Sequence, residues 1–177
     1  MDTTIEDIMT RRSVRDFAKK RVDREDLETI VEAALSAPSA SGKRPWHVVV
    51  IEDANVRARV RGAMDWFKPV EEAGAAILVC GEPAKSFQGD YWLVDCAALT
   101  ENVLLAARAL GLGSCWCGIS PIEDNVKRIR SVLDIPENLV PFSMIAIGYP
   151  AREDAFRERN RAGDGGRVTW NPDWLKA

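Results

Sequence analysis

A chain of 177 residues is long enough for a sizeable core, so we expect one domain over residues 1–177. Its hydrophobic content of 46% and charged content of 29% are ordinary for a soluble globular protein, and a net charge of -3 excludes broad electrostatic attraction to nucleic acid. The sequence has no membrane-spanning apolar run and no signal peptide, and its four cysteines lie in apolar segments, which favours a reducing cytoplasm.

The first part of the chain predicts two helices, a loop and a strand. Apolar residues share one face of a helix over residues 3–12. Asp23 is a suitable N-cap for a second helix, which Pro38 ends. A polar loop follows over residues 39–45, and the β-branched run at 46–51 predicts a buried strand.

The middle of the chain continues this alternation. Residues 53–73 are expected to be helical with interruptions at Gly62 and Pro69, and residues 75–80 form a second strand. Residues 90–110 predict a long helix of low polarity. Such a helix is buried on nearly all sides, either in the core or at a subunit interface.

The last part predicts a strand at 114–119, a helix at 123–133 and a strand at 140–147. The final stretch, 150–177, lacks periodicity but carries two tryptophans, which indicates that it docks on something. The alternation as a whole predicts a central sheet with helices on both faces.

Arginines cluster near both ends of this acidic chain. Arg-Arg-Ser-Val-Arg occupies residues 11–15, and Arg157 and Arg159 lie in the tail. The planar guanidinium binds phosphate in a bidentate manner, so the clusters are candidates for holding a specific anion. The alternative for the first cluster is a basic helix end whose arginines lie in water.

Two further segments are rich in small residues. Residues 37–46 form a backbone-rich loop, and residues 111–119 place glycines after a helix. The second segment lacks the strand and the spacing of a dinucleotide fingerprint. Each is either an ordinary connection or a flat wall for a planar ligand.

Taken together, four motifs in this order resemble the nitroreductase family of FMN enzymes, and the resemblance covers almost the whole chain. The motifs are Arg-Arg-Ser-Val-Arg at 11–15, Ala-Pro-Ser with Pro-Trp within 37–46, Gly-Leu-Gly-Ser-Cys-Trp-Cys-Gly at 111–118, and Ile-Gly-Tyr-Pro at 147–150 followed by Arg157 and Arg159.

The resemblance implies an α+β fold, an α/β/α sandwich whose central, mainly antiparallel sheet is flanked by helices. It also implies an intertwined homodimer with FMN at the interface and residues 150–177 docked on the partner subunit. The implied activity is transfer of a hydride from NAD(P)H through flavin N5 to nitroaromatic, quinone or related acceptors by a ping-pong mechanism. The flavin carries that chemistry, so no catalytic side chain is expected.

The same resemblance assigns cofactor contacts to positions of this chain. The contacts to the FMN phosphate and ribityl chain are Arg11, Arg12, Ser13, Arg15, Arg157 and Arg159. The loop contacts from the other subunit are Pro38, Ser39, Ala40 and Gly42, and the backbone of Gly118 points toward flavin N5 with Cys117 and Ile119 beside it. Family members often carry Asn and Gln where this chain has Gly42 and Arg44. Arg44 either places positive charge near the flavin or faces solvent.

Other chemistry has less support in the sequence. Cys115 and Cys117 have the wrong spacing for a zinc knuckle and His47 is the only histidine, so no metal site is expected. We expect His47 to be structural. The two thiols are expected to pack as small hydrophobes, because nothing basic near them in sequence lowers their pKa. The alternative functions are a specialised enone reductase or dehalogenase, and a non-enzymatic flavin-binding redox sensor that uses these thiols. The acceptor and the choice of NADH or NADPH stay open.

Overall fold

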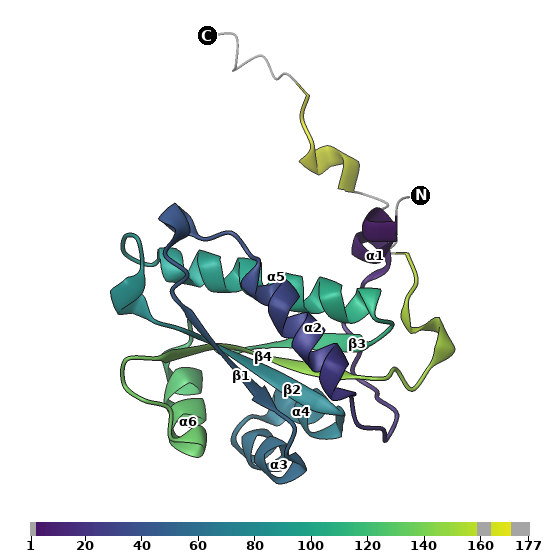
Figure 1. Ribbon diagram of the computed structural model, residues 1–177, viewed down its shortest axis with the longest axis horizontal. Helices are drawn as coiled ribbons and strands as arrows, with labels where there is room; N and C mark the ends of the chain where they lie inside the picture. The colour runs from purple at the N-terminus through teal and green to yellow at the C-terminus, as the bar shows by residue number, and fades with distance from the viewer. Residues whose placement is uncertain (1–2, 159–163, 171–177) are drawn as a thin grey trace.

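A four-stranded antiparallel sheet forms the centre of the fold in the computed structural model, which describes residues 3–158 and 164–170 (Figure 1). The strand order is β1-β2-β4-β3. The strands are β1 (Trp46–Ile51), β2 (Ala75–Gly81), β3 (Gly113–Gly118) and β4 (Val140–Gly148). Every neighbouring pair is antiparallel. This confirms the expected α+β class with an antiparallel sheet.

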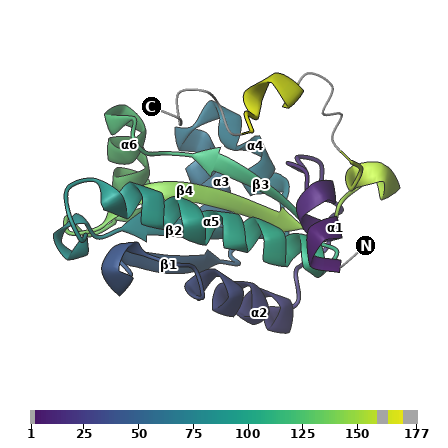
Figure 2. The same cartoon turned by 90° about the horizontal axis from the view of Figure 1, so that it is seen from above.

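Helices cover both faces of the sheet (Figures 1 and 2). One layer contains α1 (Thr3–Thr10), α2 (Arg24–Leu35) and α5 (Tyr91–Ala109). The other contains α3 (Ala54–Ala63), α4 (Lys68–Glu72) and α6 (Glu123–Leu133). Among the described residues, no helix is both long enough and apolar enough to cross a bilayer.

Two cores lie on the two faces of the central strands. Successive side chains of a strand point to opposite faces, so adjacent positions of β2 and β4 serve different cores. Ile77 pairs with Ile145 and packs toward α2 and α5, whereas Leu78 pairs with Met144 and packs toward α3, α4 and α6. The continuous apolar sequence of β2 therefore reflects burial on both faces, and every one of its residues is buried.

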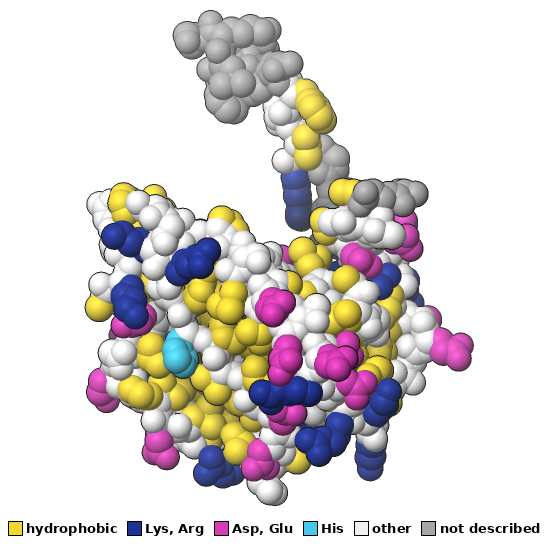
Figure 3. All heavy atoms as spheres, in the orientation of Figure 1, with side chains coloured by type: hydrophobic (Ala, Val, Ile, Leu, Met, Phe, Trp, Pro, Cys, Tyr) yellow, Lys and Arg dark blue, Asp and Glu magenta, His cyan; other side chains and the backbone are white. Residues whose placement is uncertain are grey.

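Strand β1 was expected to be buried, and this prediction was wrong. It pairs only with β2 among the described strands, and His47 and Val49 are exposed. Figure 3 shows apolar surface around the chain's one histidine, on the side where β1 lies. The β-branched run was read correctly as a strand, but composition does not report whether both faces of an edge strand are covered.

The interruptions expected in the third helical segment also need correction. Pro69 lies in the first turn of α4 and so begins a helix, because proline lacks only an N–H that would have no partner at that position. Gly62 lies inside α3, which ends one residue later. Asp23 occupies the N-cap position of α2 as predicted, but its side chain accepts a hydrogen bond from the Tyr149 hydroxyl at 3.2 Å and does not cap the helix.

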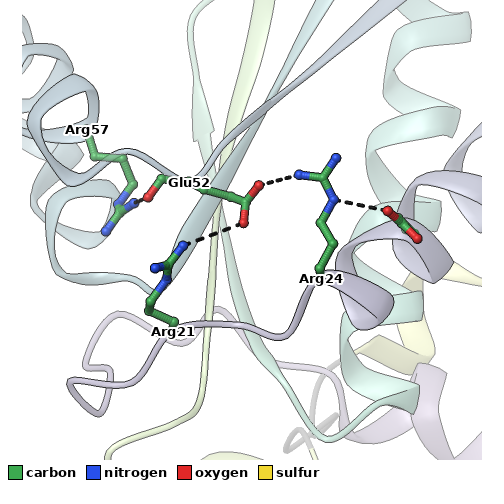
Figure 4. A network of polar contacts seen from close by, with 5 residues as sticks. Arg21, Arg24, Glu52 and Arg57 are labelled. Atoms are coloured by element: carbon green, nitrogen blue, oxygen red, sulfur yellow. Dashed lines mark hydrogen bonds and ion pairs between the residues drawn. The ribbon is translucent and has the colours of Figure 1, made fainter.

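A charged network on the surface joins α2, β1 and α3 (Figure 4). The Glu52 carboxylate accepts a hydrogen bond from Arg24 at 2.5 Å and lies 4.0 Å from Arg21. The guanidinium of Arg57, which is buried, donates to the Glu52 carbonyl oxygen at 2.7 Å. Burial lowers the pKa of Arg57. These groups act on one another across the end of β1, so we regard the network as structural.

The four cysteines are free thiols and all are buried. Burial raises the pKa of Cys80 and of Cys96 from 9.0 to about 12, and for Cys96 the nearby Asp95 adds to the effect. In the unfolded chain these thiols ionise near pH 9, whereas in the native protein they stay protonated. Ionisation therefore stabilises only the unfolded state between pH 9 and 12.

We expect the free energy of unfolding to fall above pH 9 by about 1.4 kcal/mol per pH unit for each of these two thiols. Denaturant titrations from pH 8 to 11 measure the slope. The double variant Cys80→Ala/Cys96→Ala is the control, because it removes both thiols and leaves every other titrating group. Its slope should be shallower by about 2.7 kcal/mol per pH unit. Equal slopes in the two proteins would contradict the assignment.

Candidate functional site

The segment that follows α1 lies against β3. The Val14 amide donates to the Ser114 carbonyl at 2.9 Å, and Ser13 forms a parallel bridge with Ser114. A Cβ at Gly113 would lie 2.8 Å from the Val14 side chain. Glycine at this position is therefore what allows the arginine segment to approach the strand so closely.

A polar cavity of about 480 Å³ opens beside this segment. Its lining residues are Arg12, Ser13, Val14, Arg15, Asp16, Arg152, Asp154, Ala155 and Arg157. Two backbone hydrogen bonds bring the ends of the chain together here, from Ala18 to Tyr149 at 2.9 Å and from Ala151 to Asp16 at 3.0 Å. The cavity thus gathers four guanidinium side chains from segments about 140 residues apart in sequence.

Asp154 shows that these arginines can bind an oxyanion. The Arg152 guanidinium donates two parallel hydrogen bonds to its carboxylate, both at 3.0 Å, and Arg157 lies 4.0 Å away. The Arg152 hydrogen bond holds the pKa of Asp154 below its usual value. Fork-to-carboxylate pairing is the geometry that also suits phosphate, so an incoming phosphate would compete with this carboxylate.

The arginines of the first motif do not all face the cavity. Arg12, Ser13 and Arg15 line it, as does Arg157. Arg11 instead pairs with Glu101 of α5 at 3.4 Å. Arg159 lies outside the described residues. Arg152 was missed from the sequence, although its place in the same basic tail, five residues before Arg157, was a usable signal.

The outer edge of β3 leads from this cavity to Gly118. Backbone groups of alternate residues point to the same side of a strand, so Gly118 directs its N–H to the edge at which the Ser114 carbonyl meets Val14. Four residues of strand separate these two positions by about 13 Å. Gly118 is exposed and a Cβ there would meet nothing within 4 Å, while Cys117 and Ile119 are buried. The edge of β3 at Gly118 is therefore open to a flat ligand.

The small-residue loop lies far from this cavity within one chain. The loop contains Pro38, Ser39 and the short helical turn Ala40–Gly42, and Asp95 near the start of α5 binds it. Near the other end of α5, Arg108 binds Asp7 and Thr10 of α1. Thirteen helical residues separate Asp95 from Arg108, a distance of about 20 Å. One chain therefore does not bring the loop to the cavity.

The charge of Arg15 acts on the two cysteines of β3, contrary to the expectation that nothing basic affects their pKa. The pKa of Cys115 is lowered from its usual value, first because of the hydrogen bond with the Cys117 thiol and then because of the charge on Arg15, while burial opposes the shift. Donating that hydrogen bond raises the pKa of Cys117. The sequence did not reveal this effect of charge on the pKa, because Arg15 and Cys115 are a hundred residues apart.

No group of three or more His, Cys, Asp or Glu side chains that could hold a metal ion occurs in residues 3–158 or 164–170. The candidate site is therefore an arginine-lined cavity joined to an exposed strand edge, within an α+β protein whose antiparallel sheet is covered on both faces.

The chain belongs to the nitroreductase family, whose sequence profile matches residues 8–92 and 84–149. A protein of Archaeoglobus fulgidus provisionally named NADH dehydrogenase/NAD(P)H nitroreductase is 43% identical over 159 residues, which cover 89% of this chain and 91% of that protein. This confirms the resemblance read from the four motifs.

Solved structures agree with this assignment. The crystal structure of a protein from Bacteroides thetaiotaomicron, with the same provisional name, matches with a TM-score of 0.88 and 34% identity, covering 97% of this chain and 98% of that one. An FMN-dependent nitroreductase of Clostridium difficile matches with a TM-score of 0.85 and 28% identity, covering 95% of this chain and 99% of that one.

Proposed function

We propose that this protein binds FMN with its phosphate in the arginine-lined cavity and its ring along the outer edge of β3, and that it transfers electrons from NAD(P)H to nitroaromatic, quinone or related acceptors. The enzyme class, an NAD(P)H-dependent oxidoreductase, follows from the family and from the names of its relatives. The observation that carries the proposal is the cavity, which four arginines line beside the strand that leads to Gly118.

The residues present fit FMN. A terminal phosphate is a dianion with three acceptor oxygens, and charge-assisted hydrogen bonds to such a group are the strong kind. The arginines would hold the phosphate, the Ser13 hydroxyl would donate to it, and the amide of Gly118 would orient the ring near its N5. A cavity built for one terminal phosphate favours FMN over FAD. When bound, FMN supplies the redox chemistry, and the protein supplies position and electrostatics.

A second copy of the chain completes the site in this proposal. The partner would contact the flavin through Pro38, Ser39, Ala40 and Gly42, because these residues lie too far from the cavity of their own chain. Apolar side chains left exposed on the α1, α2 and α5 layer favour such a dimer; they are Ile5, Ile8, Leu35, Tyr91 and Val94. Residues 150–177 would dock on the partner. Trp170 is 86% exposed in the single chain, and Trp174 lies outside the described residues.

The purified protein tests the proposal directly. It should be yellow with about one FMN per chain, and NADH or NADPH should bleach the colour under anaerobic conditions, after which a panel of acceptors should restore it. A colourless protein that does not take up added FMN would refute the proposal. Colour that neither nicotinamide bleaches would favour the non-enzymatic flavin-binding alternative.

The ping-pong mechanism has its own test. If both substrates use the same exposed face of the cofactor, they must occupy it in turn, and initial-rate plots at several acceptor concentrations should be parallel. Intersecting plots would exclude alternating occupancy. Acceptor panels that include an enone and a halogenated phenol separate the nitroreductase from its specialised alternatives.

The thiols of β3 offer a further prediction. Cys115→Ser and Cys117→Ser should each keep most of their turnover, because in this mechanism neither thiol transfers electrons. The lowered pKa of Cys115 makes this a real test, since the thiolate is the form that redox chemistry would need. A loss of about a thousandfold, roughly 4 kcal/mol of barrier, with FMN still bound would contradict this mechanism and point to thiol chemistry.

A further inference from the structure

The loop between α2 and β1 has an unusual backbone. Ser41, Gly42 and Arg44 all have positive φ angles, of 52°, 66° and 49°. Residues with a side chain seldom adopt this left-handed region, and two of the three carry one. Such conformations persist only where surrounding contacts hold them, and they cluster at ligand-binding segments.

Two side chains hold this backbone. Asp95 of α5 accepts a hydrogen bond from the Ala40 amide through Oδ1 at 2.8 Å. The Ser39 hydroxyl oxygen accepts one from the Arg44 amide at 2.9 Å. The first contact ties the loop to a helix of the core, whereas the second acts within the loop. Asp95 is therefore the side chain that ties the turn at Ala40–Gly42 to the rest of the protein.

Burying the Asp95 carboxylate costs free energy. The residue is only 4% exposed, and its Oδ2 has no hydrogen-bond partner among the described residues. A buried carboxylate oxygen without a donor is unfavourable, and such a group in a native structure calls for a reason. The residue also lies in the second turn of α5, past the position at which an acidic side chain caps a helix.

We infer that Asp95 is a positioning residue for the cofactor site of the partner subunit. By holding the Ala40 amide it sets the backbone of Pro38–Gly42, the segment that would lie against the flavin of the other chain. This inference rests on the proposed function, because it takes the loop to be a flavin contact. It adds a residue that touches neither flavin nor substrate, and it explains why a strained loop keeps one arrangement.

Three variants of the full-length protein test the inference. Asp95→Ala removes the acceptor, and Asp95→Asn keeps an oxygen that can accept from Ala40. Thr100→Val is the matched control, because Thr100 is a buried polar residue of the same helix whose hydroxyl pairs with Ser143 at 2.9 Å on the side away from the loop. It loses a buried hydrogen bond of similar kind without touching residues 38–44.

Two readouts separate positioning from stability. Hydrogen exchange of the amides in 39–44, measured on flavin-free protein, reports the loop itself. The dissociation constant of FMN, with the visible circular dichroism of the bound flavin, reports the site. Asp95→Ala should speed loop exchange and weaken FMN binding, each by about tenfold, the scale of one lost hydrogen bond to a charged group. Asp95→Asn should restore most of both, and Thr100→Val should change neither.

The outcomes separate the positioning role of Asp95 from the proposed function on which it rests. If Asp95→Ala binds FMN as tightly as the unaltered protein, with the same dichroism, the positioning role is wrong and the proposed function stands. Equal effects in Thr100→Val would also overturn the role, because general destabilisation would then explain them. If the unaltered protein binds no FMN, the proposed function fails, and the positioning role fails with it whatever the exchange rates show.

Discussion

Replacing Arg15 with alanine should weaken FMN binding by about 1.5–3 kcal/mol, or roughly 10- to 150-fold. Arg15 lines the anion cavity next to Ser13, in a segment that is fixed by its hydrogen bond to β3. The backbone that carries Arg15 is arranged before the phosphate arrives, so less of the binding free energy is lost to ordering this segment. Fluorescence quenching of FMN during titration of flavin-free protein measures the change.

Arg11→Ala is the matched control for this variant. Both residues belong to the same motif and both changes remove one positive charge, but Arg11 pairs with Glu101 outside the cavity lining. We expect its loss to weaken FMN binding by no more than about fivefold, the scale of a partly exposed ion pair. Equal losses in the two variants would mean that Arg11 leaves Glu101 for the phosphate, as the family resemblance implies. No loss in either variant would place the phosphate elsewhere.

The arrangement of elements along the chain was readable from the sequence. Periodicity located α5 and β4 to within a residue or two, because an apolar stripe or a β-branched run reports local geometry directly. Pro69 shows the limit of the same signals. Proline breaks a helix in its interior but begins one in its first turn, and only the neighbouring structure decides which applies.

The site was readable in part, and for a related reason. Arg12, Ser13 and Arg15 form a motif that is local in sequence, and it was found. Arg152 reaches the cavity only because backbone hydrogen bonds to residues 16 and 18 place the tail beside it. The role inferred for Asp95 depends in the same way on a contact across many residues. Such contacts leave no pattern in a single sequence.

Dimerisation should depend on an apolar patch formed by Phe87, Tyr91 and Val94, which we call the α5 patch. The Phe87 and Tyr91 rings meet edge to face at 6.2 Å, and Val94 follows Tyr91 by three residues on the same side of the helix. All three are exposed in the single chain, Val94 to 64%. An exposed aromatic cluster next to the loop that we propose to cover the flavin is where a second copy would bury surface.

Val94→Asp should therefore raise the dissociation constant of the dimer at least about a hundredfold, since a carboxylate buried there without a partner costs about 3 kcal/mol or more. Sedimentation velocity at micromolar concentration would show monomers, and these should have lost most of their FMN, because in the proposed site residues 38–42 reach the flavin from the partner. Circular dichroism should show an intact fold, as the position is exposed in the single chain.

Trp66→Asp is the control for placing a carboxylate at an exposed apolar position. Trp66 is also a large apolar residue, 53% exposed, but it belongs to the α3 and α4 layer on the opposite face of the sheet. We expect this variant to stay dimeric and yellow. If it dissociates while Val94→Asp does not, the interface lies on the other layer. A Val94→Asp protein that becomes monomeric yet keeps its FMN would show that one chain suffices to bind the cofactor, and the shared site would be wrong.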